Sequence, residues 1–148
     1  MATLVFDQEY RIARDTPSDI NEHIEVLKNL ADSVEHVTEM GTRTGVSTRA
    51  FLAADVTLRA YDLFLDGYVS QLFELAQKEG KDAKYIEANV LETEIDETDL
   101  LFIDTWHCYD QLYAELTKHA PKIKKYIAFH DTQTYGTRSE EFLSLIHI

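Results

Sequence analysis

Short apolar runs alternate with longer amphipathic stretches along most of this chain of 148 residues. Such alternation predicts a parallel sheet with helices on both faces, because parallel strands need long crossover connections that are usually helical. The clearest strand lies at residues 100–103, whose near-continuous apolar side chains are typical of a central strand buried on both faces. Further strands are expected at residues 35–40, 56–61, 83–88 and 126–129.

Helices are expected between these strands. Helical spacing of apolar residues and a helix-start signal at residues 16–19 predict an amphipathic helix over 18–32. Its apolar positions are Ile20, Ile24, Leu27 and Leu30. Further helices are expected at residues 45–54, 66–80 and 109–120, irregular segments at 1–16 and 130–142, and a solvated turn or short helix at 91–99. No repeat or long linker divides the chain, so residues 1–148 are predicted to form one domain.

Composition excludes some classes of protein. Acidic residues outnumber basic ones by 27 to 14, which gives a net charge of −13 and argues against a nucleic-acid partner. Cys108 is the only cysteine, so no intrachain disulfide can form. No apolar stretch approaches the length of a membrane span, and the N-terminus lacks a secretory pattern. We therefore expect a soluble, cytoplasmic protein that does not bind membranes.

Polar or glycine residues follow all five predicted strands. They are Glu39 and Gly41, Asp62, Asn89, Asp104, and the pair His130-Asp131. In parallel α/β sheets, ligands bind beyond the carboxyl ends of the strands, near the switch in strand order. Packing alone does not readily explain this pattern, so the sequence predicts a ligand site at that edge.

The turn from Gly41 to Gly45 permits a tight bend and a close approach of a ligand to the backbone. Its G-x-x-x-G spacing differs from the G-x-G-x-x-G of dinucleotide folds, which argues against a nicotinamide cofactor. A tight turn without any ligand explains it equally well. Asp62 follows Gly41 by 21 residues and suits hydrogen bonding to ribose hydroxyls, although it could also cap a helix.

In order and spacing, these motifs resemble those of class I S-adenosylmethionine-dependent methyltransferases. The matching segments are residues 37–48 (first motif), Asp62 (second-strand acid), residues 88–90 (after strand three) and residues 99–104 (fourth-strand motif). The chain is most similar to the small-molecule O-methyltransferase and cephalosporin-hydroxylase-like subgroup. That subgroup often carries Ile-Asp-x-x-His-x-Tyr, here residues 103–109, and His-Asp-Thr, here residues 130–132. The resemblance covers about residues 16 to 135.

This resemblance implies a Rossmann-like sheet with strand order 3-2-1-4-5 and S-adenosylmethionine as the cofactor. Residues 1–33 would be an N-terminal segment and residues 34–135 the cofactor-binding core. The implied cofactor-binding residues are Glu39, Gly41, Thr42, Thr44, Gly45, Asp62, Asn89, Val90 and Asp104. The turn and Glu39 would hold the methionine part, Asp62 the ribose, and Asn89 and Val90 the adenine, with Asp104 beside the reacting methyl group.

Metal-dependent relatives bind a divalent ion through a fourth-strand aspartate and a polar pair after strand five. Asp104, His130 and Asp131 occupy those positions, with His-Asp in place of the Asp-Asn of catechol enzymes. Carboxylates suit magnesium, whereas an imidazole favours manganese, iron or zinc. The implied catalytic residues are Asp104, His107 and His130, with His107 as a candidate general base. Alternatively, Asp104 caps the next helix and both histidines are structural.

The sequence therefore favours O-methylation of a hydroxylated small molecule or sugar, assisted by a divalent metal. Two alternatives stay open: a non-catalytic S-adenosylmethionine-binding module, and an oxidoreductase that uses a nucleotide cofactor on a Rossmann-like sheet. The oligomeric state is open as well.

The last six residues, 143–148, resemble the translation of a transposon-end adapter used in sequencing libraries. We expect this tail to be non-native and the final strands of the methyltransferase fold to be missing. A chain without those strands could be inactive.

Overall fold

Within the residues that the computed structural model describes, 4–105 and 108–130, five parallel strands form one sheet in the order β3-β2-β1-β4-β5. The strands are β1 (His36–Met40), β2 (Thr57–Asp62), β3 (Ala83–Glu87), β4 (Thr98–Ile103) and β5 (Ile123–Phe129). Every neighbouring pair is parallel. The predicted fold class and strand order are therefore confirmed.

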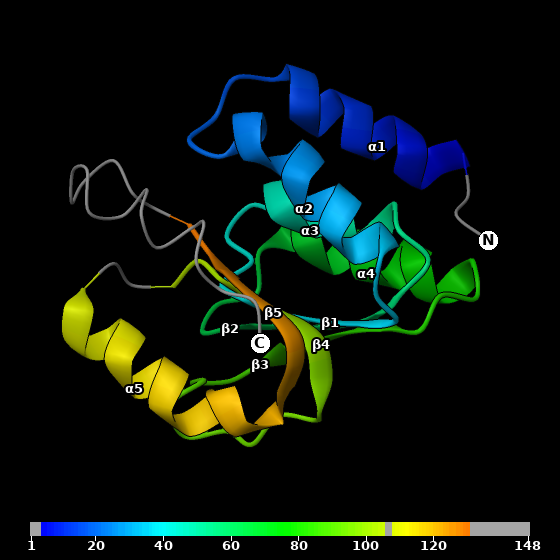
Figure 1. The fold of residues 1–148 in the computed structure, drawn as a ribbon. Coiled ribbons are helices and arrows are strands. Elements are labelled where there is room, and N and C mark those ends of the chain that lie inside the picture. The colour runs from blue at the N-terminus through cyan, green and yellow to red at the C-terminus, as the bar shows by residue number, and fades with distance from the viewer. Residues whose placement is uncertain (1–3, 106–107, 131–148) are drawn as a thin grey trace.

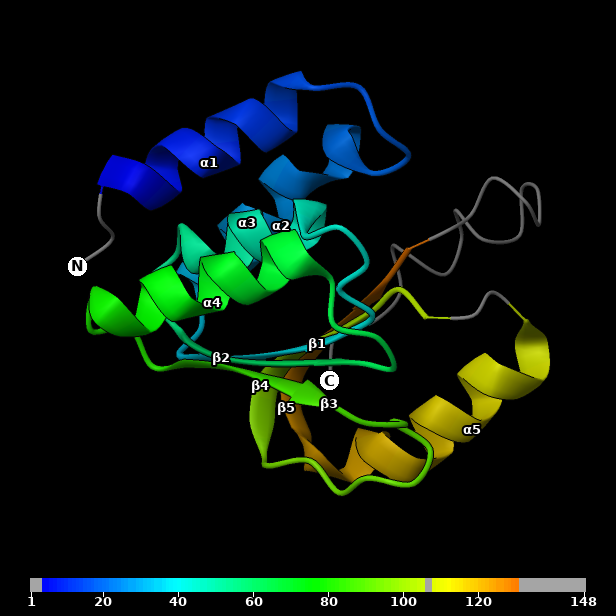
Figure 2. The same cartoon turned by 180° about the vertical axis from the view of Figure 1, so that it is seen from behind.

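Helices cover the two faces of the sheet unequally (Figures 1 and 2). One face carries α1 (Leu4–Asp15), α2 (Ile24–Asp32), α3 (Val46–Leu52) and α4 (Gly67–Lys78), and the other carries α5 (Tyr109–His119). Two short 3₁₀ turns, Asn21–His23 and Ala120–Lys122, complete the described elements. The chain moves outward from β1 to β3 and then returns to β4, and right-handed crossovers in opposite directions place helices on opposite faces.

Strand β4 divides its side chains between two hydrophobic cores. Leu100 and Phe102 point into the core beneath α1 to α4, and Phe102 packs edge-to-face on Phe51 with ring centroids 5.8 Å apart. Leu101 and Ile103 belong to the second core, on the α5 side. All six residues of β4 are buried, which confirms the prediction of a strand covered on both faces.

The prediction that residues 1–16 are irregular is wrong. They contain α1, whose buried residues Phe6, Tyr10 and Ala13 are spaced four and three positions apart and form one apolar stripe. The predicted helix over 18–32 begins later, at Ile24. Its start is delayed because the Ser18 hydroxyl accepts hydrogen bonds from backbone N–H groups of Ile20 and Asn21, which favours a turn.

Several predictions fall on residues outside the described ranges. These are the predicted catalytic His107, the predicted metal ligand Asp131 and the tail at 143–148. In the part of the chain that is described, every helix is too short or too polar to cross a bilayer.

Helix α4 offers a test of local stability at its first turn. The Asp66 carboxylate accepts hydrogen bonds from the N–H groups of Tyr68 (2.9 Å) and Val69 (3.1 Å), as an N-cap does. We expect Asp66→Ala to lower the free energy of unfolding by about 1 kcal/mol in urea titration. The control is Glu74→Ala, which removes an exposed acid from the same helix and should change stability by less than about 0.5 kcal/mol. Equal losses in both variants would contradict the capping role.

Candidate cofactor site at the carboxyl edge of the sheet

The glycine turn after β1 brings three strand ends together. The N–H of Gly41 donates to the carbonyl oxygen of Tyr61 (2.7 Å), and the N–H of Asp104 donates to that of Met40 (2.7 Å). Gly41 has φ +90°, and a Cβ there would lie 2.1 Å from the carbonyl oxygen of Asp104. Only glycine fits this position, so the sequence leaves bare backbone at the point where a ligand would approach.

Asp62, at the end of β2, holds the turn in place. Its Oδ2 accepts hydrogen bonds from the N–H groups of Thr42 (2.8 Å) and Arg43 (3.0 Å) and from the Thr42 hydroxyl (3.2 Å). Its Oδ1 accepts from the N–H of Leu63 (2.7 Å). The Asp62 carboxylate therefore holds the turn that follows β1 in a fixed shape. Its contact with a ribose stays a prediction.

Glu39 is a buried carboxyl group that joins β1 to α3. Its side chain is 0% exposed, and its two oxygens accept hydrogen bonds from the hydroxyls of Ser47 (2.5 Å) and Thr48 (2.8 Å). Burial raises the pKa of Glu39 to about 8, although both hydroxyls favour the charged form. Sequence reasoning missed Ser47 and Thr48. In the structure, Glu39 links β1 to the helix that follows the turn. Its contact with the cofactor stays a prediction.

Glu39 should make the stability of the protein depend on pH. Between pH 4.5 and about 8 the unfolded chain ionises Glu39 while the folded chain keeps its proton, so the free energy of unfolding falls as pH rises through this window. We expect Glu39→Gln to remove this fall, on the order of a few kcal/mol, in urea titrations from pH 5 to pH 8. Burial also raises the pKa of Glu115, but its effect on the pH dependence of stability is the same in the wild type and in Glu39→Gln. If the free energy of unfolding of Glu39→Gln fell with pH as steeply as that of the wild type, Glu39 would not be the cause of the pH dependence.

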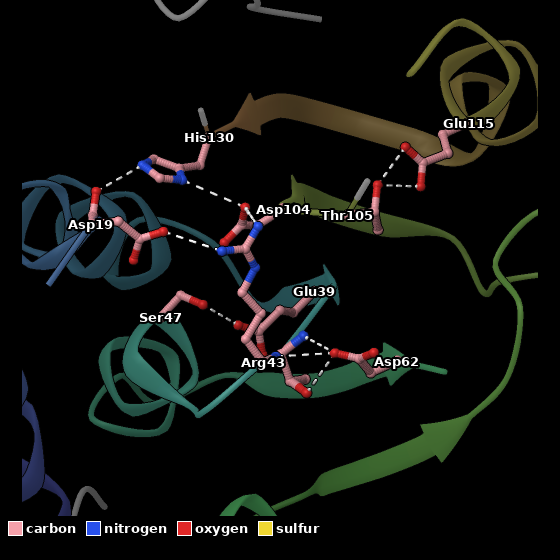
Figure 3. A network of polar contacts seen from close by, with 10 residues as sticks. Asp19, Glu39, Arg43, Ser47, Asp62, Asp104, Thr105, Glu115 and His130 are labelled. Atoms are coloured by element: carbon pink, nitrogen blue, oxygen red, sulfur yellow. Dashed lines mark hydrogen bonds and ion pairs between the residues drawn. The ribbon is translucent and has the colours of Figure 1, made fainter. Parts of the chain in front are cut away.

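Asp104 lies within a cluster of charged groups from distant segments (Figure 3). Its carboxylate is 5% exposed, and its Oδ1 lies 3.6 Å from Nη2 of Arg43 and 3.5 Å from Nδ1 of His130. Asp19, from the connection between α1 and α2, contacts both Arg43 and His130. Its carboxylate lies 3.2 Å from Nη1 of Arg43, and its carbonyl oxygen accepts from Nε2 of His130 (3.1 Å).

Helix α5 anchors the other side of the edge. The buried carboxylate of Glu115 accepts hydrogen bonds from the Thr105 hydroxyl (2.8 and 2.7 Å to its two oxygens) and from Nε2 of Gln111 (3.2 Å). The buried His119 donates through Nε2 to the carbonyl oxygen of Val90 (2.7 Å). These contacts fix the segment after β4 and the segment after β3, both of which carry predicted site residues.

A pocket of about 390 Å³ opens between these segments. The predicted residues that line it are Gly41, Asp62, Asn89, Val90 and Asp104. Glu39, Thr42 and Gly45 lie buried in the frame of the turn, Thr44 is exposed, and His130 lies beside Asp104. Arg43 and Ala88 also line it and lie within the predicted segments 41–45 and 88–90. The lining residues that sequence reasoning missed are Tyr61, Leu63, Phe64, Leu91, Thr105 and Gln111.

Comparison with solved structures identifies the fold. A caffeoyl-CoA O-methyltransferase-like protein from Staphylococcus aureus shares 17% identity over 95% of this chain and 77% of its own, with a TM-score of 0.62. Magnesium protoporphyrin IX methyltransferase from Synechocystis, solved with S-adenosylmethionine, shares 11% identity over 86% and 70% of the two chains, with a TM-score of 0.61. The chain has the S-adenosylmethionine-dependent methyltransferase fold.

A third structure with the methyltransferase fold contains both a cofactor product and an acceptor. The 1,6-didemethyltoxoflavin-N1-methyltransferase from Burkholderia thailandensis, with its acceptor and S-adenosylhomocysteine, shares 18% identity over 84% of this chain and 57% of its own, with a TM-score of 0.60. No family model matches the sequence, and no curated protein matches it. The methyltransferase fold is therefore recognised through structure, with the strand order that the resemblance implied.

Proposed function

We propose that this protein binds S-adenosylmethionine in the pocket at the carboxyl edge and transfers its methyl group to an oxygen of a hydroxylated small molecule or sugar. The observation that carries the proposal is the turn at Gly41, where a Cβ would collide with backbone, held by a carboxylate at the end of the next strand. This arrangement leaves room for a ligand against bare backbone and fits a nucleoside-containing cofactor.

The size and lining of the pocket support this assignment. Its volume of about 390 Å³ falls within the usual range for small-molecule sites. The apolar lining residues Leu63, Phe64 and Val90 suit an adenine ring, and the charged lining residues Arg43 and Asp104 suit a charged amino-acid end. The acidic net charge of the chain also favours a small acceptor over a nucleic acid.

S-adenosylmethionine supplies an electrophilic methyl group attached to a positively charged sulfur. The residues of this chain would contribute mainly position, because methyl transfer requires the acceptor oxygen in line with the methyl carbon. The Gly41 turn and Asp62 would fix the cofactor, and Asp104 would lie beside the reacting centre. Among the compared proteins, the Burkholderia enzyme binds a small-molecule acceptor, which supports the same class here.

Assistance by a divalent metal stays a prediction. Asp104 and His130 converge at 3.5 Å, but the described residues contain no group of three or more His, Cys, Asp or Glu side chains able to hold a metal. The Arg43 guanidinium also contacts the same oxygen of Asp104, and a nearby positive charge disfavours a second cation. The described part of the site therefore does not by itself fit a metal, and we assign no step to one.

Two measurements test the proposed function. Calorimetry should detect S-adenosylmethionine binding to the purified chain and no comparable binding of NAD⁺, which separates a methyltransferase from the oxidoreductase alternative. Transfer of a labelled methyl group to catechols, other phenols and sugars, after EDTA treatment and with added Mg²⁺ or Mn²⁺, then tests the reaction and its metal dependence. Binding of NAD⁺ alone would overturn the proposal. Cofactor binding without transfer to any acceptor would favour the non-catalytic binding module.

A further inference from the structure

Helix α5 buries two polar residues where apolar ones would be expected. Its fully buried residues are Glu115 and His119, both 0% exposed. Its leucines, Leu112 and Leu116, are only partly buried. Burying polar groups costs free energy, and apolar side chains of similar volume often replace buried polar pairs without loss of stability. Packing alone therefore does not explain why these two positions are polar.

The two buried residues lie one helical turn apart and contact different walls of the pocket. Glu115 reaches from α5 to Thr105, which follows β4 (Figure 3), and also accepts a hydrogen bond from Gln111. His119 donates to the carbonyl oxygen of Val90, which follows β3, at 2.7 Å. Thr105, Gln111 and Val90 all line the pocket. Helix α5 thus bridges the two strand ends between which the pocket opens.

Hydrogen bonding rather than charge is the contribution of this pair. Burial raises the pKa of the Glu115 carboxyl and lowers the pKa of the His119 imidazole, so both shifts favour the neutral forms. A carbonyl oxygen only accepts, so Nε2 of His119 carries the hydrogen. Nδ1 of the same ring has no hydrogen-bond partner among the described residues. The bond to Val90 is therefore the polar contact that the structure provides for this buried ring.

We propose that Glu115 and His119 are positioning residues that set the separation of the two pocket walls, so that α5 acts as a clip across the pocket. A hydrogen bond constrains both distance and angle, whereas apolar contact is non-directional. Neither residue lines the pocket, so each would act on a ligand through the groups that it holds. This inference rests on the proposed function and adds to it two residues that do not touch the cofactor.

Calorimetry with S-adenosylhomocysteine compares apolar and polar replacements. We expect Glu115→Leu and His119→Leu each to weaken binding about 10-fold, because the pocket walls lose their fixed positions. Glu115→Gln keeps an acceptor and His119→Gln keeps a donor, so each should weaken binding less than about threefold. Such a rescue by the polar variants would separate positioning from the filling of space.

Urea titration establishes that each variant is folded under the conditions of calorimetry. If a leucine variant does not fold, Glu115→Asp and His119→Asn take its place, because they keep a polar group but shorten its reach, and they should weaken binding to the same extent. The control is Thr98→Val at the start of β4. It removes an equally buried hydroxyl, 1% exposed, that contacts His36 (2.8 Å to Nδ1), and should leave the affinity unchanged.

Hydrogen exchange tests the clip without any ligand. The N–H of Glu92 donates to the carbonyl oxygen of Asn89 (2.9 Å), in the segment that His119 holds through Val90. We expect His119→Leu to speed exchange of this N–H by at least about fivefold, because the segment opens more often. Exchange of the Leu58 N–H, which donates to the carbonyl oxygen of Asp82 (2.9 Å) near the start of β2, should not change.

The clip and the proposed function can fail separately. Unchanged affinity in the folded leucine or shortened variants would overturn the clip and leave the proposed function intact. Equal losses in the leucine and glutamine variants, or an equal loss in Thr98→Val, would also overturn the clip. If the wild type did not bind S-adenosylhomocysteine, the proposed function would fail, and the exchange rate of the Glu92 N–H would still decide whether His119 holds the segment after β3.

Discussion

Replacing Gly41 with alanine is expected to lower the free energy of unfolding by about 3–5 kcal/mol and to abolish cofactor binding. Two effects combine in this variant. The φ of +90° is strained for any residue with a Cβ, and that Cβ would lie 2.1 Å from the carbonyl oxygen of Asp104. Backbone on both sides must move, because the Asp104 N–H is itself bonded to the carbonyl of Met40. Urea titration and calorimetry with S-adenosylmethionine measure the two losses.

Gly67 provides the matched control for this prediction. It is the first residue of α4, and a Cβ there would have nothing within 4 Å. Gly67→Ala should therefore leave stability unchanged or raise it by up to about 1 kcal/mol. If Gly41→Ala behaved like Gly67→Ala, the close contact between the turn and the end of β4 would be wrong.

The strands of the sheet were predictable where burial on both faces requires apolar side chains. Strand β4 is covered on both faces, and its residues 100–103 form the unbroken apolar run that revealed it. Its first two residues, Thr98 and Asp99, are polar yet buried, so their assignment to a solvated turn or short helix was wrong. Strand β5 was predicted three residues too short, because the exposed Lys124 and Lys125 near its start conceal the apolar pattern. Among the described strands β5 is an edge strand, where lysines are common because they oppose further strand pairing.

The candidate site was predictable only where one segment determines the geometry. The spacing of Gly41 and Asp62 reflects one strand–helix–strand unit, and the structure joins the two through the backbone of Thr42 and Arg43. The contact of Arg43 with Asp19 spans 24 positions and depends on how the N-terminal helices pack over the sheet. No local pattern encodes such a contact. The hydroxyls that bind Glu39 lie eight and nine residues away, on a helix whose rotation is set by packing.

Removing the carboxylate of Asp62 should weaken both cofactor binding and the folded state. We expect Asp62→Ala to weaken S-adenosylmethionine binding by about 100-fold or more, since several hydrogen bonds to a charged group are lost together. Loss of the acceptor leaves the N–H groups of Thr42, Arg43 and Leu63 without their side-chain partner, and the turn should lose its fixed shape. The free energy of unfolding should fall by about 1–3 kcal/mol.

Asp82→Ala is the charge-matched control for Asp62→Ala. Asp82 pairs with Arg59 at 2.9 Å and does not line the pocket, so its removal changes the net charge equally but leaves the turn untouched. We expect this control to retain the affinity of the wild type. If both variants lost affinity equally, the effect would come from long-range charge. If Asp62→Ala retained full affinity, the pocket at the carboxyl edge could not be the cofactor site, because its central turn would have been released without consequence.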